Sequence, residues 1–303
     1  MPKQNIALVL SGGGARGLAH IGAIEELEKH GYTITSIAGT SMGALVGAVY
    51  ATGKLKIFKD WMCSLDKKGV FDLVDFTLGN GGIIKGVRII KELKKMVPDQ
   101  NIEDLSIPFC AVATDIIQNK EVVFREGKLY DAIRSSISIP TVFTPFKIND
   151  MQLVDGGVLN PIPINRVIRT NGDLLVAVDV NAQIPFKRAS PETKKSSPTN
   201  GYFKYMNSIQ SRLNNYIPKS KTDSIGYFNL MNKSISLMTH QISTLTIEKY
   251  PPDILVNISK QAYETYEFYK AVEIIKEGEQ AMQMVLEKVS SRLDFFNSEI
   301  SKV

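Results

Sequence analysis

The chain has 303 residues, 44% of them hydrophobic and 22% charged, which is the composition of an ordinary globular protein with room for a large core. Its formal net charge of +5 is too small to indicate nucleic acid, although it allows contact with anionic lipid headgroups. Two isolated cysteines and three scattered histidines predict neither a disulfide framework nor a metal cluster. We also expect no transmembrane helix and no signal peptide, which favours a cytoplasmic location, with room for peripheral membrane contact.

The N-terminal part of the chain alternates strands and helices. Apolar runs at residues 6–10 and 34–38 have the length of buried strands, and helical spacing follows them at residues 18–30 and 42–52. Glycine-containing turns join each strand to the next helix. This order predicts an α/β fold with parallel strands buried between helices.

Further elements follow towards the C-terminus. Helices are predicted at residues 54–66, 87–96, 129–136, 222–247 and 263–293, and strands at residues 108–114, 121–124, 174–180 and 253–258. The composition of residues 183–198 shifts to Pro, Ser, Thr and Lys, which indicates a loop. We therefore expect a single domain over residues 1–303, with a variable helical and loop insertion at about 183–250.

The first chemical motif is a GxSxG sequence at residues 39–43, between a predicted strand and a predicted helix. A tight turn in this position exposes the hydroxyl of Ser41, and the flanking glycines prevent side-chain clashes. The backbone N–H groups at the start of the helix, beginning with that of Met42, can stabilise an oxyanion. The alternative is that Thr40 or Ser41 only caps the helix.

The second motif places Gly12, Gly13 and Gly14 directly after the first predicted strand. Consecutive glycines let backbone amides converge on an anion, as in an oxyanion hole. Together with Gly17, the same run fits the GxGxxG pattern of dinucleotide-binding folds. Such folds need an acidic residue at the end of the second strand, and residues 36–39 contain none, so dinucleotide binding is disfavoured.

The third motif is the Asp-Gly-Gly sequence that begins at Asp155. Asp-Gly is a common turn, and this is one interpretation of the motif. The other is a carboxylate held against the Ser41 hydroxyl. A free carboxylate is a poor base for a serine, but desolvation beside Leu153 and Val154 would raise its pKa.

A Ser-His-Asp triad is the main alternative arrangement of catalytic groups. In α/β-hydrolases the histidine follows the acid in the chain, and His240 is the sole histidine after Asp155. His240 lies outside the apolar seam of its predicted helix, so a solvated or hydrogen-bonded histidine is favoured over a catalytic one. We expect His20 to pack or to form a local hydrogen bond.

Together these motifs resemble the patatin-like phospholipases in their bacterial form. The matching segments are residues 11–22, 39–43, 132–140 (AIRSSISIP), 153–163 (LVDGGVLNPIP) and 271–278. The resemblance runs in order from about residue 5 to 180, and the combination of motifs is specific. One departure is Ser11, which precedes the glycines where many members have Asp.

The resemblance implies a three-layer α/β/α fold with a mainly parallel central sheet. It also implies a Ser41–Asp155 dyad without histidine, an oxyanion hole from Gly12, Gly13 and Gly14, and Arg16 nearby as a substrate-binding residue. The implied activity is a serine acyl hydrolase that releases fatty acids from phospholipids, lysophospholipids or related esters without a metal or cofactor. The alternative is a non-catalytic lipid-binding or regulatory protein on the same fold. The oligomeric state is left open.

The helix predicted at residues 54–66 has an apolar face, formed by Leu55, Phe58, Trp61, Met62 and Leu65. Such a face either packs into the core or contacts a lipid chain. We predict that it aids the uptake of substrate, with Trp61 as a binding residue.

Overall fold

The computed structural model describes residues 4–75, 84–186 and 227–300. Its strands are β1 (Gln4–Leu10), β2 (Tyr32–Thr40), β3 (Phe109–Asp115), β4 (Lys120–Phe124), β5 (Phe146–Ile148), β6 (Met151–Asp155), β7 (Leu174–Ala182) and β8 (Ile254–Ser259). Its α-helices are α1 (Ala19–Lys29), α2 (Met42–Ala51), α3 (Leu55–Ser64), α4 (Lys67–Asp72), α5 (Val87–Met96), α6 (Leu129–Ser136), α8 (Tyr227–Lys249) and α9 (Ala271–Ile300). Short 3₁₀ helices are η1 (Gly14–Leu18), η2 (Ile102–Asp104), η3 (Gly156–Val158), η4 (Ile164–Arg166) and η5 (Phe268–Lys270).

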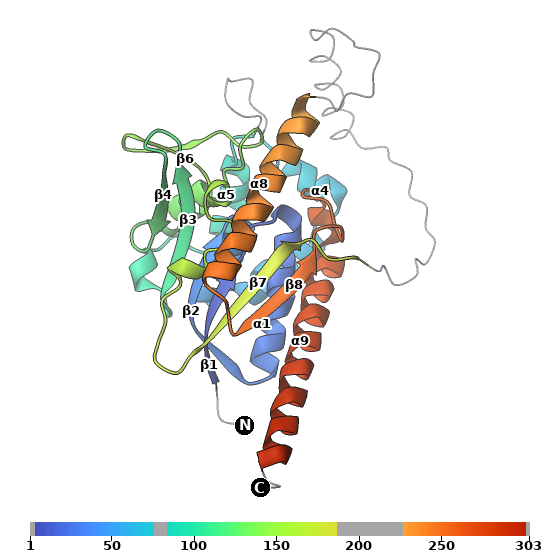
Figure 1. Ribbon diagram of the computed structural model, residues 1–303. Coiled ribbons are helices and arrows are strands. Elements are labelled where there is room, and N and C mark those ends of the chain that lie inside the picture. The colour runs from blue at the N-terminus through green and yellow to red at the C-terminus, as the bar shows by residue number, and fades with distance from the viewer. Residues whose placement is uncertain (1–3, 76–83, 187–226, 301–303) are drawn as a thin grey trace, which may run out of the picture. The chain divides into compact units, whose positions relative to one another are not determined.

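The strands form one eight-stranded sheet in the order β5-β6-β3-β2-β1-β7-β8, with β4 also paired to β3 (Figure 1). Pairing is parallel from β3 through β2, β1 and β7 to β8. It is antiparallel where β4 and β6 meet β3 and where β5 meets β6. The mainly parallel sheet is therefore confirmed, but the expectation of parallel strands does not extend to its β3–β5 edge. Short turns connect β3 to β4 and β5 to β6, and such hairpins require antiparallel pairing.

Successive side chains of β1 point to opposite faces of the sheet, so they contribute to two separate hydrophobic clusters. Ile6, Leu8 and Leu10 point into the main core beneath α1, α2 and α9. Ala7 and Val9 point into a smaller cluster on the other face, which includes Ile162 and Ile164 from the segment after β6. Ile247, in the last turn of α8, packs against this cluster. Because both faces are covered, β1 reads as a continuous apolar run in the sequence. The three-layer α/β/α expectation is confirmed.

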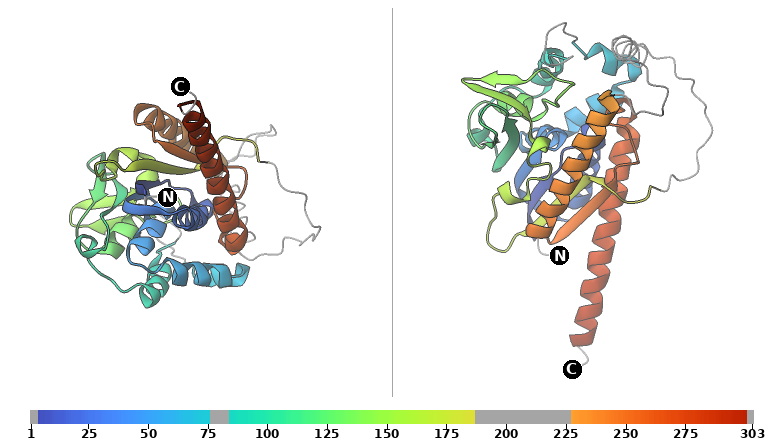
Figure 2. Two further views of the ribbon diagram at one scale, coloured as in Figure 1. Left: turned by 90° about the horizontal axis from the view of Figure 1, so that it is seen from below. Right: turned by 45° about the horizontal axis from the view of Figure 1, so that its top comes forward.

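Helices α1 and α9 lie side by side on the main-core face of the sheet (Figures 1 and 2). The helix predicted at residues 263–293 begins later, at Ala271. The residues before it form turns, in which Glu264 N–H donates to the Glu267 carboxylate at 3.1 Å and Lys270 N–H to the Glu267 carbonyl at 2.9 Å. Local hydrogen bonds from polar residues thus delay the helix.

The chain divides into two compact units, residues 1–186 with 239–303, and residues 187–238. The second unit falls within the predicted insertion. The helix predicted at residues 222–247 is observed as α8. Residues 222–226 of that helix and residues 187–198 of the loop predicted at 183–198 lie outside the described residues. In the part of the chain that the structure describes, no helix is both long and apolar enough to cross a membrane.

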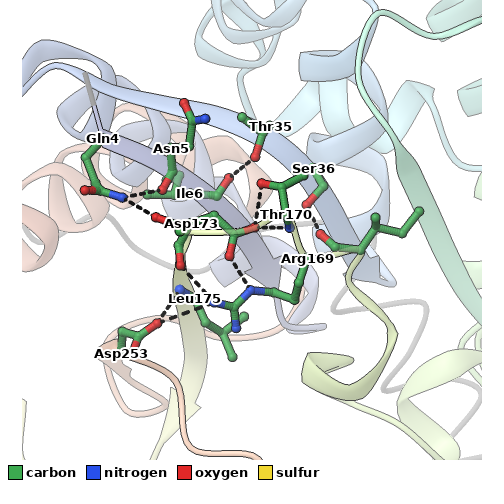
Figure 3. A network of polar contacts seen from close by, with 12 residues as sticks. Gln4, Asn5, Ile6, Thr35, Ser36, Arg169, Thr170, Asp173, Leu175 and Asp253 are labelled. Atoms are coloured by element: carbon green, nitrogen blue, oxygen red, sulfur yellow. Dashed lines mark hydrogen bonds and ion pairs between the residues drawn. The ribbon is translucent and has the colours of Figure 1, made fainter. Parts of the chain in front are cut away.

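A network of polar contacts holds the amino ends of β1, β7 and β8 together (Figure 3). Its centre is Asp173, which accepts hydrogen bonds from Arg169 Nε at 2.5 Å and from Thr170 N–H at 2.6 Å. Next to it, the N–H of Leu175 donates to Asp253 Oδ2 at 2.6 Å. The network fixes the end of the sheet that lies away from the motif residues described next.

Candidate active site

The GxSxG sequence forms the sharp turn that the motif predicts. Strand β2 ends at Thr40, helix α2 begins at Met42, and Ser41 between them has φ 54° and ψ −123°. A positive φ is strained for a residue with a side chain, and such strain persists only where the surroundings enforce it. A Cβ on Gly43 would lie 2.3 Å from the Leu10 carbonyl oxygen, so only glycine lets α2 approach β1 this closely.

Asp155 lies within hydrogen-bonding distance of Ser41. It is the last residue of β6, and it pairs with Ala113 of β3, next to Val112, the partner of Thr40. The two side chains therefore meet across β3. The Ser41 hydroxyl donates to Asp155 Oδ2 at 2.5 Å, and the N–H of Gly157 donates to Oδ1 at 2.7 Å. The predicted serine and carboxylate are thus in direct contact.

Burial controls the electrostatics of this pair. Ser41 and Asp155 are only 5% and 6% exposed. Desolvation raises the pKa of Asp155 to about 6, although the hydrogen bonds from Ser41 and Gly157 partly lower it. A carboxyl with this pKa is ionised at neutral pH and is a far better proton acceptor than an ordinary aspartate.

In the described residues, no histidine side chain forms a hydrogen bond with Ser41 or Asp155. His20 is fully buried, and its Nε2 lies 2.8 Å from the Ser11 carbonyl oxygen. Burial lowers its pKa to about 4, so the ring is neutral. His30 Nδ1 lies 2.9 Å from the Glu26 carbonyl oxygen, and His240 lies on α8. The arrangement has the Ser and Asp of a triad without its histidine.

The glycine turn lies directly beside Ser41, since a Cβ on Gly12 would be 3.2 Å from that of Ser41. The amide of Gly12, however, donates to the Pro161 carbonyl at 2.9 Å. Gly12 therefore enters the predicted oxyanion hole with an amide that already has an acceptor, and its role there stays a prediction. The amides of Gly13 and Gly14 have no acceptor within the described part of the chain. The N–H of Met42 lies in the first turn of α2, where helix amides have no intrahelical partner.

Arg16 is buried and has a structural set of contacts. Its guanidinium donates to the carbonyl oxygens of Val180 and Tyr263 at 3.1 and 2.9 Å, and to Asn181 Oδ1 at 2.8 Å. Asn181 in turn donates from Nδ2 to the Gly12 carbonyl at 2.5 Å. Arg16 therefore braces the glycine turn, and its expected role in substrate binding stays a prediction.

The apolar face of α3 packs against the main core. Phe58 and Met62 are buried, and Trp61 is partly buried with its ring centroid 6.0 Å from that of Phe58. The structure thus shows the face packed against the core, and the role of Trp61 in substrate binding stays a prediction. The amphipathic pattern could not separate these alternatives, because both need the same spacing of apolar residues.

Three contacts that hold the pair in place carry no chemical signature in the sequence. They are Thr40 Oγ1 to the Asn160 carbonyl (2.8 Å), Ser41 N–H to Ser136 Oγ (2.8 Å) and Asp155 N–H to the Ser138 carbonyl (2.9 Å). The sequence pointed to these residues only by their position. Ser136 and Ser138 lie in segment 132–140 and Asn160 in segment 153–163, both of which match the family pattern. Within the described residues, no group of three or more His, Cys, Asp or Glu side chains could hold a metal ion.

Comparison with known proteins finds a family model, curated proteins and a solved structure that are similar to this chain. Residues 8–168 match the family model of the patatin-like phospholipases. An uncharacterised NTE family protein of Mycobacterium tuberculosis is 32% identical over 93% of this chain and 91% of its own length. Lysophospholipase NTE1 of Candida glabrata is 28% identical over 91% of this chain but only 16% of its own length. The crystal structure of VipD from Legionella pneumophila covers 95% of this chain and 67% of its own, with a TM-score of 0.47 and 14% identity.

Proposed function

The chain belongs to the patatin-like phospholipase family, a family of lipid hydrolases, and from this premise we propose that it is a serine acyl hydrolase with Ser41 as nucleophile and Asp155 as general base. One observation carries the proposal. The Ser41 hydroxyl, on a strained strand-to-helix turn, donates at 2.5 Å to a buried carboxylate whose pKa is raised to about 6. A structural serine would need neither the strain nor the desolvated partner.

In the first step, Ser41 Oγ forms a bond to the ester carbonyl carbon while its proton moves to Asp155 Oδ2. The negative charge on the carbonyl oxygen is stabilised by the amides of Gly13, Gly14 and Met42. The ester C–O bond then breaks, and the leaving alkoxide takes the proton from Asp155. An acyl-serine and a free alcohol or lysolipid remain.

In the second step, a water molecule attacks the acyl-serine and gives its proton to Asp155. The bond between Ser41 Oγ and the acyl carbon breaks, the proton returns to Ser41, and the fatty acid leaves. Asp155 acts as base and then as acid in each step, and its raised pKa suits both roles because it lies near neutral pH.

The substrate class follows from the family and from one relative. The relative named a lysophospholipase favours a single-chain phospholipid, and diacyl phospholipids or simpler acyl esters are the further candidates. Such substrates reside in membranes or micelles, so we also propose peripheral contact with a lipid surface during turnover.

The test compares wild type with Ser41→Ala and Asp155→Asn on a p-nitrophenyl ester and on a lysophospholipid. Ser135→Ala is a matched control that removes another buried serine hydroxyl. Ser135 is fully buried in α6, and its hydroxyl donates at 2.6 Å to the carbonyl of Asp131 within that helix. We expect both site variants to be folded and to lose activity by about 10³-fold or more, while the control remains active.

Full activity of Ser41→Ala would exclude this serine as the nucleophile. If wild type hydrolyses neither substrate, a fluorophosphonate probe separates the remaining possibilities. Labelling of wild type but not of Ser41→Ala would identify an enzyme with a narrower substrate range. Absence of labelling would favour a non-catalytic lipid-binding protein on this fold.

A further inference from the structure

The end of helix α6 contacts the backbone of the proposed nucleophile. Ser136, the last residue of α6, is fully buried, and its hydroxyl makes two hydrogen bonds. It accepts from the N–H of Ser41 at 2.8 Å and donates to the Val112 carbonyl of β3 at 2.6 Å. One hydroxyl thus links α6, β3 and the strained turn.

The same short segment also holds the base. The carbonyl of Ser138, two residues further on, accepts from the N–H of Asp155 at 2.9 Å. The position of Asp155 is further fixed from the β3 side, since a Cβ on Gly156 would lie 2.2 Å from the Val112 carbonyl oxygen. Both Ser136, which binds the N–H of Ser41, and Gly156, which follows Asp155 in the chain, therefore lie against the Val112 carbonyl.

The segment itself is held firmly by Arg134. Its guanidinium donates to Ser138 Oγ at 2.5 Å and to the carbonyl oxygens of Lys85 and Thr144 at 2.6 and 3.0 Å. The cation also lies 5.4 Å from the ring centroid of Phe143. Arg134, Ser136 and Ser138 thus form a braced support that contacts the backbones of both Ser41 and Asp155.

We propose that Ser136 is a positioning residue that holds Ser41 in its strained conformation and thereby sets the contact between the Ser41 hydroxyl and Asp155. This inference rests on the proposed function. Ser136 does not act on substrate, because its hydroxyl is fully buried and both of its hydrogen bonds are made to backbone groups.

A hydroxyl group suits this position because it donates and accepts at once. Alanine would leave the N–H of Ser41 and the carbonyl of Val112 without their partner, and buried backbone groups rarely remain unpaired. The turn at Ser41 would then relax towards an ordinary φ, and its hydroxyl would move away from Asp155. Misplacement of a reacting group by about 1 Å can cost about 10²-fold in rate.

This role predicts a specific kinetic signature for Ser136→Ala. We expect kcat to fall by about 10- to 100-fold with little change in KM for a short ester, since substrate contacts are untouched. The acid limb of the pH–rate profile should also move to higher pH. The hydrogen bond from Ser41 lowers the pKa of Asp155, so that weakening the bond raises the pKa.

The experiment measures kcat, KM and the pH–rate profile on a p-nitrophenyl ester for wild type, Ser136→Ala, Ser136→Thr, Ser135→Ala and Ser41→Ala, each with its melting temperature. Ser136→Thr keeps the hydroxyl and should retain more activity than Ser136→Ala, with the acid limb of wild type. Ser135→Ala removes a neighbouring buried hydroxyl of the same helix and should leave kcat and the pH profile unchanged.

Three results would overturn the proposal. The first is a folded Ser136→Ala with the kcat and pH profile of wild type. The second is a Ser135→Ala variant that reproduces the changes of Ser136→Ala, which would assign them to general packing of α6. The third, which remains decisive if Ser136→Ala does not fold, is a folded Ser136→Thr whose acid limb is shifted. Retained activity of Ser41→Ala would instead refute the proposed function.

Discussion

Two buried aspartates at opposite ends of the sheet have opposite electrostatics. Asp155 is 6% and Asp173 is 7% exposed, but Asp155 is enclosed far more deeply by the surrounding protein than Asp173. Burial raises the pKa of both carboxyls, but at Asp173 the hydrogen bonds from Thr170 and Arg169 outweigh it and the pKa lies below its ordinary value. Among the residues that the structure describes, the Asp155 carboxylate accepts hydrogen bonds only from the Ser41 hydroxyl and the Gly157 amide, and its pKa is raised to about 6.

The difference separates a stabilising carboxylate from a reactive one. A carboxylate paired with Arg and a backbone amide is held in its charged form, and Figure 3 shows these partners converging on Asp173. In the described part of the chain, Asp155 has no cationic hydrogen-bond partner, so its charge is costly and a proton from Ser41 relieves that cost. An aspartate thus stabilises the fold at one end of the sheet, and an aspartate is the proposed base at the other end.

The largest expected effect contrasts the two aspartates by activity. Asp155→Asn should lower kcat/KM by about 10³- to 10⁴-fold, because an amide cannot accept the proton of Ser41. Asp173→Asn should stay within about 3-fold of wild type at a temperature where it is folded, since surface and structural sites act on rate only through stability. Ester hydrolysis by both purified variants measures the contrast. Equal losses would mean that Asp155 is also only structural.

The second effect is the pH dependence of the wild-type rate. The base must be ionised, so kcat/KM should fall below pH about 6, by about 10-fold per pH unit, and reach a plateau above it. A pH–rate profile between pH 4 and 8 measures the limb. Asp173→Asn is the control and should leave it in place. An acid limb near pH 4 would show that Asp155 titrates as an ordinary carboxyl.

The third effect is the change in the free energy of unfolding when Asp155 is replaced. Its folded pKa of about 6 exceeds the ordinary 3.8, so its contribution to stability is fully present below pH about 4 and is lost as the pH rises through 6. Asp155→Asn removes the buried charge and should therefore raise the free energy of unfolding at pH 8 by up to about 3 kcal/mol, with little gain at pH 4. Denaturant unfolding at both pH values measures the gain. Destabilisation at pH 8 would contradict the desolvation argument.

The smallest effect, with the opposite sign, is expected at Asp173. Its folded pKa is lowered, so its contribution is present above the ordinary pKa and is lost as the pH falls through the folded value. Asp173→Asn should lower the free energy of unfolding at pH 7 by about 1–3 kcal/mol, because donors on Thr170 and Arg169 lose a charged acceptor. The loss should shrink in strong acid. A variant as stable as wild type at pH 7 would show that this network contributes little.

Most elements follow from the sequence because their signals are local. The helices at residues 87–96 and 129–136 were predicted with the bounds that the structure has. Helix α4 and strands β5 and β6 were not predicted, since each is short and lacks a periodic apolar pattern. The final helix starts later than predicted because Glu267 accepts the hydrogen bonds that form turns before it.

The sequence by itself determined the α/β class and brought out Ser41, Asp155 and the glycine turn, because turn geometry depends on neighbouring residues. Only the tertiary structure decided how these groups are used. The amide of Gly12 binds the Pro161 carbonyl, Arg16 binds Val180 and Tyr263, and Ser136 holds Ser41. These partners are far apart in the chain, and no local pattern records which buried donor will meet which acceptor after the layers pack.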